Sequence, residues 1–248
     1  MKKMCMLVIV AGWLILPVCS EGYNIVIQPD GSAGKDTFNV SGGWLENPNT
    51  NWETHPVIIA GYFNGGYAIR RSFLQFDLSS IPAGSEITNA TLTFWAAANT
   101  YYGAVSQTVS AYQMLVDWEE SQVNWYNRKT GVTWNNSGCT NDGVDVKVSP
   151  ENSVNIYYPV GSPWIPYSFN LTSLVQKWHE GIVPNYGMLL RGANESNTGK
   201  EVCFISSDYS DASFRPKLEV TVVPEPSTLF LLGTTLLGLV GLRKKKKD

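Results

Sequence analysis

The sequence predicts an all-β protein, an antiparallel jelly-roll-like β-sandwich with one short helix and an apolar segment at each end. Gly, Pro, Asn and Asp residues interrupt the chain at short intervals, and many of the runs between them alternate apolar and polar side chains. A period of two is typical of strands that bury one face. Short strands, many turns and a single helical pattern together favour a sandwich.

Two runs in the first half of the chain predict the clearest strands. Residues 70–78, RRSFLQFDL, place Leu74 and Phe76 on one face and Arg71, Phe73 and Gln75 on the other. Residues 87–96, ITNATLTFWA, alternate in the same way, with Ala90, Leu92 and Phe94 opposite Thr91, Thr93 and Trp95. In residues 70–78, the side with Arg71, Phe73 and Gln75 is expected to face outward.

The second half of the chain predicts a helix and two more strands. Residues 170–181, NLTSLVQKWHEG, carry apolar side chains at helical spacing, namely Leu171, Leu174, Val175 and Trp178. Gly181 is a typical stop for this helix. Residues 186–192 and 217–222 are short runs rich in strand-forming residues.

The first 20 residues, 1–20, predict a secretory signal peptide. Two lysines precede an apolar run, residues 4–16, and a small residue stands directly before Glu21. This charged, apolar and small-residue layout is typical of exported proteins. We expect export through the Sec machinery, cleavage before Glu21, and a mature domain spanning residues 21–223.

Residues 227–242 are uncharged and predict a transmembrane helix. As an α-helix they span about 24 Å at about 1.5 Å per residue. This is somewhat less than the roughly 30 Å of a hydrocarbon core, so the bilayer has to thin locally or the basic side chains have to snorkel toward its surface. Five basic side chains follow directly: Arg243, Lys244, Lys245, Lys246 and Lys247. By the positive-inside rule they stay on the cytoplasmic side and leave the domain outside.

Pro224, Glu225 and Pro226 stand just before this predicted helix. The tripeptide, the apolar span and the basic cluster at the C-terminus resemble the PEP-CTERM sorting tail of Gram-negative bacteria. The resemblance implies that residues 224–248 insert transiently in the inner membrane and that an exosortase cuts near the tripeptide. It places the mature protein at the cell surface or in the extracellular matrix. The residues themselves are equally compatible with a tail that is cut and a tail that stays as an anchor.

The domain between the two ends is acidic. Residues 21–223 hold 11 Lys and Arg and 19 Asp and Glu, a net charge of −8. A domain of this charge is a poor general binder of nucleic acid or of anionic membranes. We therefore expect no nucleic-acid partner, and an acidic ligand would need a local basic patch.

Two cysteines, Cys139 and Cys203, remain after the signal peptide. An even pair in an exported protein predicts a disulfide between them, and two buried thiols are the alternative. His55 and His179 are the two histidines of the sequence. Neither has ligand spacing to the cysteines, so no zinc site is expected.

Four stretches, in order, resemble the DNRLRE domain, a bacterial surface domain related to a carbohydrate-binding module family. They are residues 70–96, 117–136, 169–192 and 204–222. The resemblance implies a jelly-roll-like β-sandwich in a secreted protein, and some members of the family bind alginate. The name-giving hexapeptide of the family is not present, and the strands before Arg70 diverge.

Nothing in the sequence predicts a catalytic constellation. Asp117, Glu119 and Glu120 form the richest acidic stretch, but neighbouring strand residues point to opposite faces, whereas a glycosidase needs two carboxylates across the bond it cuts. The sequence has no nucleophile elbow, and two histidines give no convincing triad. We predict a non-catalytic protein, with a polysaccharide lyase that uses a Tyr or His base as a distant alternative.

No cofactor is expected, and a structural Ca²⁺ is only a weak alternative. The weak candidates for its ligands are Asp142 and Asp145, in the stretch NDGVDV. Oxygen ligands at this spacing suit calcium, but Asn, Asp and Gly are also ordinary turn residues.

Sugar binding is the positive prediction. Exposed aromatic rings cover the apolar faces of sugars, and Arg grips a carboxylate with two hydrogen bonds. The outward side of residues 70–78 offers Arg71, Phe73 and Gln75, and Arg191 joins them if its strand lies alongside. We predict that the domain binds an acidic exopolysaccharide. The alternative is a structural matrix or surface protein that binds other proteins and no glycan.

Overall fold

The computed structural model describes residues 8–10, 13–15, 21–32, 34–44, 46–97, 105–159, 161–196 and 200–224. Antiparallel β-sheet is the main regular structure of this part of the chain, which contains one α-helix, α1 (Thr172–His179). The predicted all-β class with one short helix is therefore confirmed.

The two predicted end segments lie largely outside the described residues. Two short strands near the N-terminus are described, β1 (Val8–Val10) and β2 (Trp13–Ile15), and they pair with each other. In the described part of the chain no helix has the length and apolar character needed to cross a membrane. Residues 225–248, with Glu225, Pro226 and the basic cluster, are not part of it.

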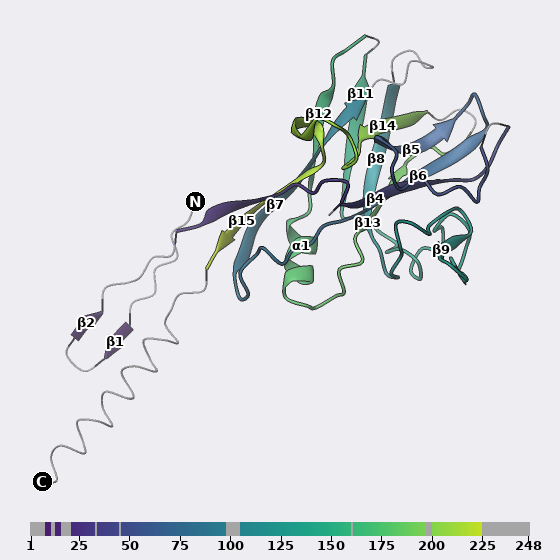
Figure 1. Cartoon of the computed structure of the whole chain (residues 1–248). Helices are drawn as coiled ribbons and strands as arrows, with labels where there is room; N and C mark the ends of the chain where they lie inside the picture. The colour runs from purple at the N-terminus through teal and green to yellow at the C-terminus, as the bar shows by residue number, and fades with distance from the viewer. Residues whose placement is uncertain are drawn as a thin grey trace, which may run out of the picture.

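Of the strands in the described residues, eleven form one continuous antiparallel sheet (Figure 1). They are β3 (Tyr23–Ile27), β4 (Lys35–Val40), β5 (Val57–Phe63), β6 (Ala68–Gln75), β7 (Glu86–Ala97), β8 (Val105–Gln113), β11 (Asn152–Tyr158), β12 (Ile165–Asn170), β13 (Met188–Gly192), β14 (Glu201–Ile205) and β15 (Lys217–Val223). A separate hairpin is formed by β9 (Asn127–Lys129) and β10 (Val132–Thr133). A 3-10 helix, Ala212–Phe214, precedes β15.

The sheet folds over into two layers that face each other. One layer runs β11-β8-β13-β6, with β4 also paired to β6. The other runs β12-β7-β15-β3, and β5 and β14 connect the two. In Figure 1, β3, β7 and β15 form a ribbon that extends from the sandwich toward the chain ends.

The main core lies between the layers. Leu74 and Phe76 point into it from the end of β6, and they meet Ala90, Leu92 and Phe94 of β7, all fully or almost fully buried. These are the faces that the alternating runs predicted. Burying a large apolar side chain contributes about 1.5–3 kcal/mol, so this pattern fixes the register of both strands.

Helix α1 closes one end of this core. Leu171, Leu174, Val175 and Trp178 are buried in the same cluster, as their helical spacing predicted. The chain leaves the helix through Gly181, whose φ of 68° lies in the left-handed region that glycine adopts readily.

A second cluster covers the opposite side of β6 and β13. Residues 114–148, here called the cover segment, fold over this side and pack Trp118 and Trp134 onto Phe73 and Leu189. The ring of Phe73 stacks on that of Trp134 with centroids 5.3 Å apart. The face that the sequence analysis took as outward and exposed is therefore a small second core.

The predicted disulfide is not formed. Cys139 and Cys203 are both buried thiols, and they lie in different clusters. Cys139 packs in the second core with Met114, whereas Cys203 packs beside Phe38 and Ile59 in a third. An even cysteine count predicts pairing only when the fold brings the two Cα atoms within about 7 Å, and here each thiol fills its own apolar site.

Candidate functional site

The outer face of the second layer is open to solvent and is the candidate binding face. Along β7, Thr91, Thr93 and Trp95 point outward and are partly exposed, while the alternate residues enter the core. Cross-strand pairing places Ser168 of β12 and Lys217 of β15 on either side of Thr93. The hydroxyls of Thr93 and Ser168 are 3.0 Å apart and hydrogen-bonded.

Aromatic rings gather at one end of this face. Trp95 meets Phe214 edge to face, with ring centroids 5.1 Å apart. Phe214 in turn contacts Trp164, at 4.1 Å, and Trp164 contacts Tyr209, at 5.0 Å. All four rings are partly exposed, and edge-to-face pairs of this kind are favourable beyond their buried area. The result is a rigid, half-exposed aromatic surface, which we call the ring cluster (Trp95, Trp164, Tyr209 and Phe214).

The loop that carries Tyr209 and Phe214 is fixed by hydrogen bonds. Asp211 accepts from the amide and the hydroxyl of Ser213, at 3.0 and 2.7 Å, which caps the 3-10 helix. The side chain of Gln28, just beyond β3, donates to the carbonyls of Ala212 and Arg215, at 2.8 and 3.1 Å. The rings are therefore held in place before any ligand arrives.

Two cations flank the ring cluster. Arg215 donates from Nε to the carbonyl of Tyr209, at 2.7 Å. Lys217 lies next to Thr93 on the outer face, and its Nζ is 3.4 Å from a carboxylate oxygen of Glu219, in a half-exposed pair. Pairs of this exposure are weak, so Lys217 can exchange Glu219 for an anionic ligand at little cost.

Arg71 and Phe73, two of the predicted glycan contacts, are not on the surface. Phe73 is 0% exposed and Arg71 5%. The guanidinium of Arg71 is ion-paired with Glu195 and donates to the carbonyl of Gly138, at 2.7 Å. It also lies over the ring of Trp125, 5.3 Å from its centroid. The prediction that these two side chains face solvent is wrong, because the cover segment packs on Phe73 and, together with Glu195, supplies the partners of Arg71.

Arg191 does lie beside these residues, because β13 pairs with β6. Its guanidinium lies over the ring of Tyr112, 4.3 Å from the centroid, and pairs with Asp142 at 3.1 Å. Gln75 donates to the carbonyl of Asn185, at 2.6 Å. Both predicted contacts are thus occupied within the fold.

The calcium candidates are likewise occupied. Asp145 is fully buried and accepts from the backbone amides of Asn135 and Asn136, at 3.1 and 3.2 Å, and from the Asn135 side chain, at 2.8 Å. Asp142 is the partner of Arg191. Among the described residues no group of three or more His, Cys, Asp or Glu side chains is arranged to hold a metal ion.

The carboxylates of the acidic stretch in the cover segment have partners within the fold. Asp117 pairs with Arg128 and Lys129, whereas Glu120 turns inward and accepts from the amide of Asp36, at 2.7 Å. Burial raises the pKa of Glu120 to about 7 and that of Asp36 to about 7. Asp36 is 2% exposed, so a substrate cannot reach it, and these carboxyls belong to the fold.

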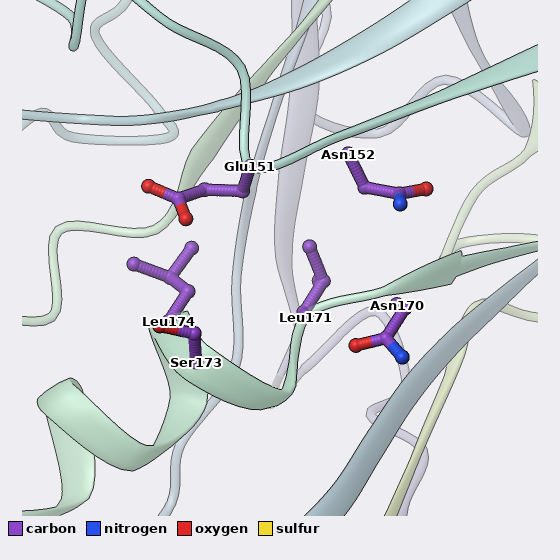
Figure 2. Close-up of a pocket in the computed structure, with 6 residues that line it drawn as sticks. All are labelled: Glu151, Asn152, Asn170, Leu171, Ser173 and Leu174. Carbon is purple, nitrogen blue, oxygen red and sulfur yellow. The ribbon is translucent and has the colours of Figure 1, made fainter.

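A pocket of ≈ 270 Å³ lies at the start of α1 (Figure 2). Leu171 and Leu174 line it together with the amides of Asn152 and Asn170, and Glu151 points its carboxylate along one side. Glu151 is the one ionisable side chain of the lining, and Lys147 pairs with it at 2.7 Å. The pocket therefore lacks the acid and base pair that glycoside hydrolysis needs.

Comparison with known families matches residues 46–220, most of the chain, to the disaggregatase-related repeat domain. The chain belongs to the disaggregatase-related repeat domain family. Residues 222–246 match the PEP-CTERM protein-sorting motif, which confirms the predicted sorting tail. No curated protein matches the chain.

These matches bear on several predictions from the sequence. The PEP-CTERM motif makes this disaggregatase-related repeat protein a secreted, exosortase-processed surface protein. Its two families are a repeat domain and a sorting motif, neither of which is catalytic in kind. The family matched differs from the DNRLRE family that four stretches resembled, so the link to alginate-binding modules stays a prediction.

Sequence reasoning missed most of the ring cluster. The alternation of β7 did place Trp95 on the same face as Thr91 and Thr93. Nothing in the sequence connects it to Trp164 or Phe214, since these rings lie on separate loops that meet only in the folded sheet.

Proposed function

We propose that this domain binds an acidic exopolysaccharide at the cell surface, without transforming it, through the outer face of β7, β12 and β15. The observation that supports this most directly is the ring cluster beside Arg215 and Lys217 on a solvent-facing sheet. We further propose that the C-terminal segment tethers the chain transiently in the inner membrane before exosortase processing.

The chemistry of this face suits a uronate polymer. Half-exposed rings such as Trp164 cover the apolar face of a sugar, and the hydroxyls of Thr93 and Ser168 replace water at its hydroxyl groups. Lys217 and Arg215 supply positive charge for a carboxylate. In a domain of net charge −8, such local cations are what allows an anionic chain to approach at all.

The positions of the carboxylates Glu219, Asp36 and Glu120 favour binding without catalysis. Glu219, on the outer face, pairs with Lys217, and Asp36 and Glu120 are held inside the fold. Neither arrangement puts two carboxyl groups across a bound sugar, as hydrolysis requires.

The test is affinity electrophoresis of the mature chain, residues 21–224, in gels that contain alginate or polygalacturonate. We expect retardation that salt weakens, and a loss of at least tenfold in affinity for Trp164→Ala and for Lys217→Ala. Val148→Ser, which changes a 65% exposed side chain of the cover segment, is the matched control and should bind like the wild type. Circular dichroism checks that each variant is folded.

Failure of every acidic polymer to retard the chain would overturn the proposal. Concentration-dependent association together with indifference to glycans would favour the alternative, a structural matrix protein with protein partners. A new unsaturated product from a uronate polymer would show a lyase.

A further inference from the structure

A pair of aromatic side chains stands on the surface away from the ring cluster. Trp44 is 83% exposed and Tyr67 58%. Their ring centroids are 5.7 Å apart and their planes are tilted by 56°. Tyr67 belongs to the turn between β5 and β6, and Trp44 to the loop after β4. We call the two rings the tip pair.

The backbone beneath the tip pair is fixed. The amide of Trp44 donates to the carbonyl of Gly66, at 3.1 Å. Gly43 lies so close to the same carbonyl that an added Cβ would be 2.0 Å from its oxygen, so only glycine fits there. Nearby, the Ser41 amide donates to the carbonyl of Ile69, and its hydroxyl accepts from the Ile69 amide, at 2.9 and 2.8 Å.

Tyr67 also has an unfavourable backbone conformation. Its φ is 57°, in the left-handed region that a bulky residue rarely adopts. An exposed ring gains little from burial that could offset this strain. Strain of this kind at an exposed side chain is typical of a site that binds something.

The tip pair carries no available charge. Arg70, three positions after Tyr67, is ion-paired with both Glu46 and Glu201 and lies over the ring of Phe63, 4.4 Å from the centroid. The loop that follows Trp44 presents amides instead: Asn47 and Asn49 are exposed and joined by hydrogen bonds of 2.9 and 3.2 Å. The surface thus combines two open rings with neutral hydrogen-bonding groups.

We propose that the tip pair is a second carbohydrate site, which stacks on an uncharged pyranose unit of an extracellular polysaccharide. Two tilted rings form a shallow V that matches the apolar face of one sugar ring, and amides are the neutral partners that orient hydroxyls. A protein partner would need about 800 Å² of matched surface, whereas the sequence on either side of Trp44 and Tyr67 is rich in Gly, Asn and Thr. The inference rests on the proposed function only in placing the domain among glycans.

This second site differs from the outer face in its chemistry and its residues. The outer face carries cations and is formed by β7, β12 and β15. The tip pair is neutral and lies on the loop after β4 and on the turn between β5 and β6. A polymer with both charged and neutral units would engage the two sites together, and linked sites raise overall affinity without new contacts.

The experiment measures retardation of the mature chain in gels that contain neutral polymers, namely hydroxyethyl cellulose, xylan and dextran. We expect retardation by at least one of them, and a loss of at least tenfold in affinity for Trp44→Ala and for Tyr67→Gly. Tyr67→Gly relieves the backbone strain while it removes the ring, so the variant should be no less stable than the wild type. Trp164→Ala, which alters the outer face, should keep its affinity for the neutral polymer.

The outcomes separate this site from the proposed function. Retardation by uronate polymers alone overturns the second site and leaves the proposed function intact. Retardation by a neutral polymer that depends on Trp44, without any retardation by uronate polymers, supports the second site and overturns the proposed function. Self-association abolished by Trp44→Ala, with no retention by neutral glycans, would overturn the inference in favour of a contact between copies of the chain.

Discussion

The backbone amide of Asp36 donates a hydrogen bond to a carboxylate oxygen of Glu120, at 2.7 Å. This bond joins the edge of β4 to the cover segment. The Asp36 carboxyl in turn accepts from the amide and the hydroxyl of Ser207, at 2.9 and 3.1 Å. A buried carboxyl group, that of Asp36, and a half-buried one, that of Glu120, therefore lie next to each other where three parts of the chain meet.

Stability should fall as the pH rises through neutrality. Burial raises the pKa of Asp36 from 3.8 to about 7, and the pKa of Glu120 is raised to about 7 for the same reason. Because the folded pKa lies above the unfolded one, this stabilisation is full below about pH 4 and is lost as the pH passes 7. Urea unfolding at pH 5 and pH 8 should differ by about 2 kcal/mol for Asp36 alone.

Asp36→Asn is the matched variant for this effect. The amide is isosteric with the neutral acid and keeps partners on Ser207, whose hydroxyl can turn to accept. The variant should be more stable than the wild type at pH 8 and should show a smaller difference between the two pH values. An unchanged pH dependence in Asp36→Asn would contradict the role of this carboxyl.

The two thiols should behave as buried side chains and not as a disulfide. Cys139 and Cys203 lie in separate clusters, and burial raises the pKa of the Cys139 thiol. Since the thiolate is the reactive form, alkylation should be slow in the native protein and complete after denaturation. A reductant should leave the midpoint of thermal unfolding unchanged. A mass two hydrogens lower than that of the dithiol form would contradict this.

Arg71→Ala should lower stability and leave glycan binding unchanged. The variant leaves Glu195 without its buried partner and removes a donor from the carbonyl of Gly138. Breaking a buried ion pair from one side costs about 3–5 kcal/mol, measured as the free energy of unfolding in urea. Glu219→Gln, which breaks the exposed pair with Lys217, is the control and should cost no more than about 1 kcal/mol. If Arg71→Ala is folded but no longer binds uronate polymers, the prediction is contradicted and Arg71 takes part in glycan binding.

The predictable part of the fold is the part set by local period. The alternation of β7 placed Ala90, Leu92 and Phe94 on one face, which is the buried one, and the helical spacing predicted α1 with its buried face. The cover segment has no such period, because short turns and the small β9–β10 hairpin make up much of it. Arg71 therefore looked like an outward cation, since its partner Glu195 lies 124 positions away. The ring cluster could not be predicted for the same reason, because its rings meet only through tertiary packing.

Removal of the sorting tail should leave the domain intact. Strand β15 is complete at Val223, with Val222 fully buried and paired to both β3 and β7. A chain that ends after Pro224 should therefore keep the circular dichroism spectrum and unfolding midpoint of the full chain in detergent. A chain that ends after Val220 loses the buried Val222 and its ladder hydrogen bonds, and should be less stable by about 2–4 kcal/mol. The intact mass of the native secreted protein then locates the exosortase cut, which we expect at or beyond Pro224. A mature C-terminus before Val222 would contradict this, because processing would then have to open a strand that is paired on both sides.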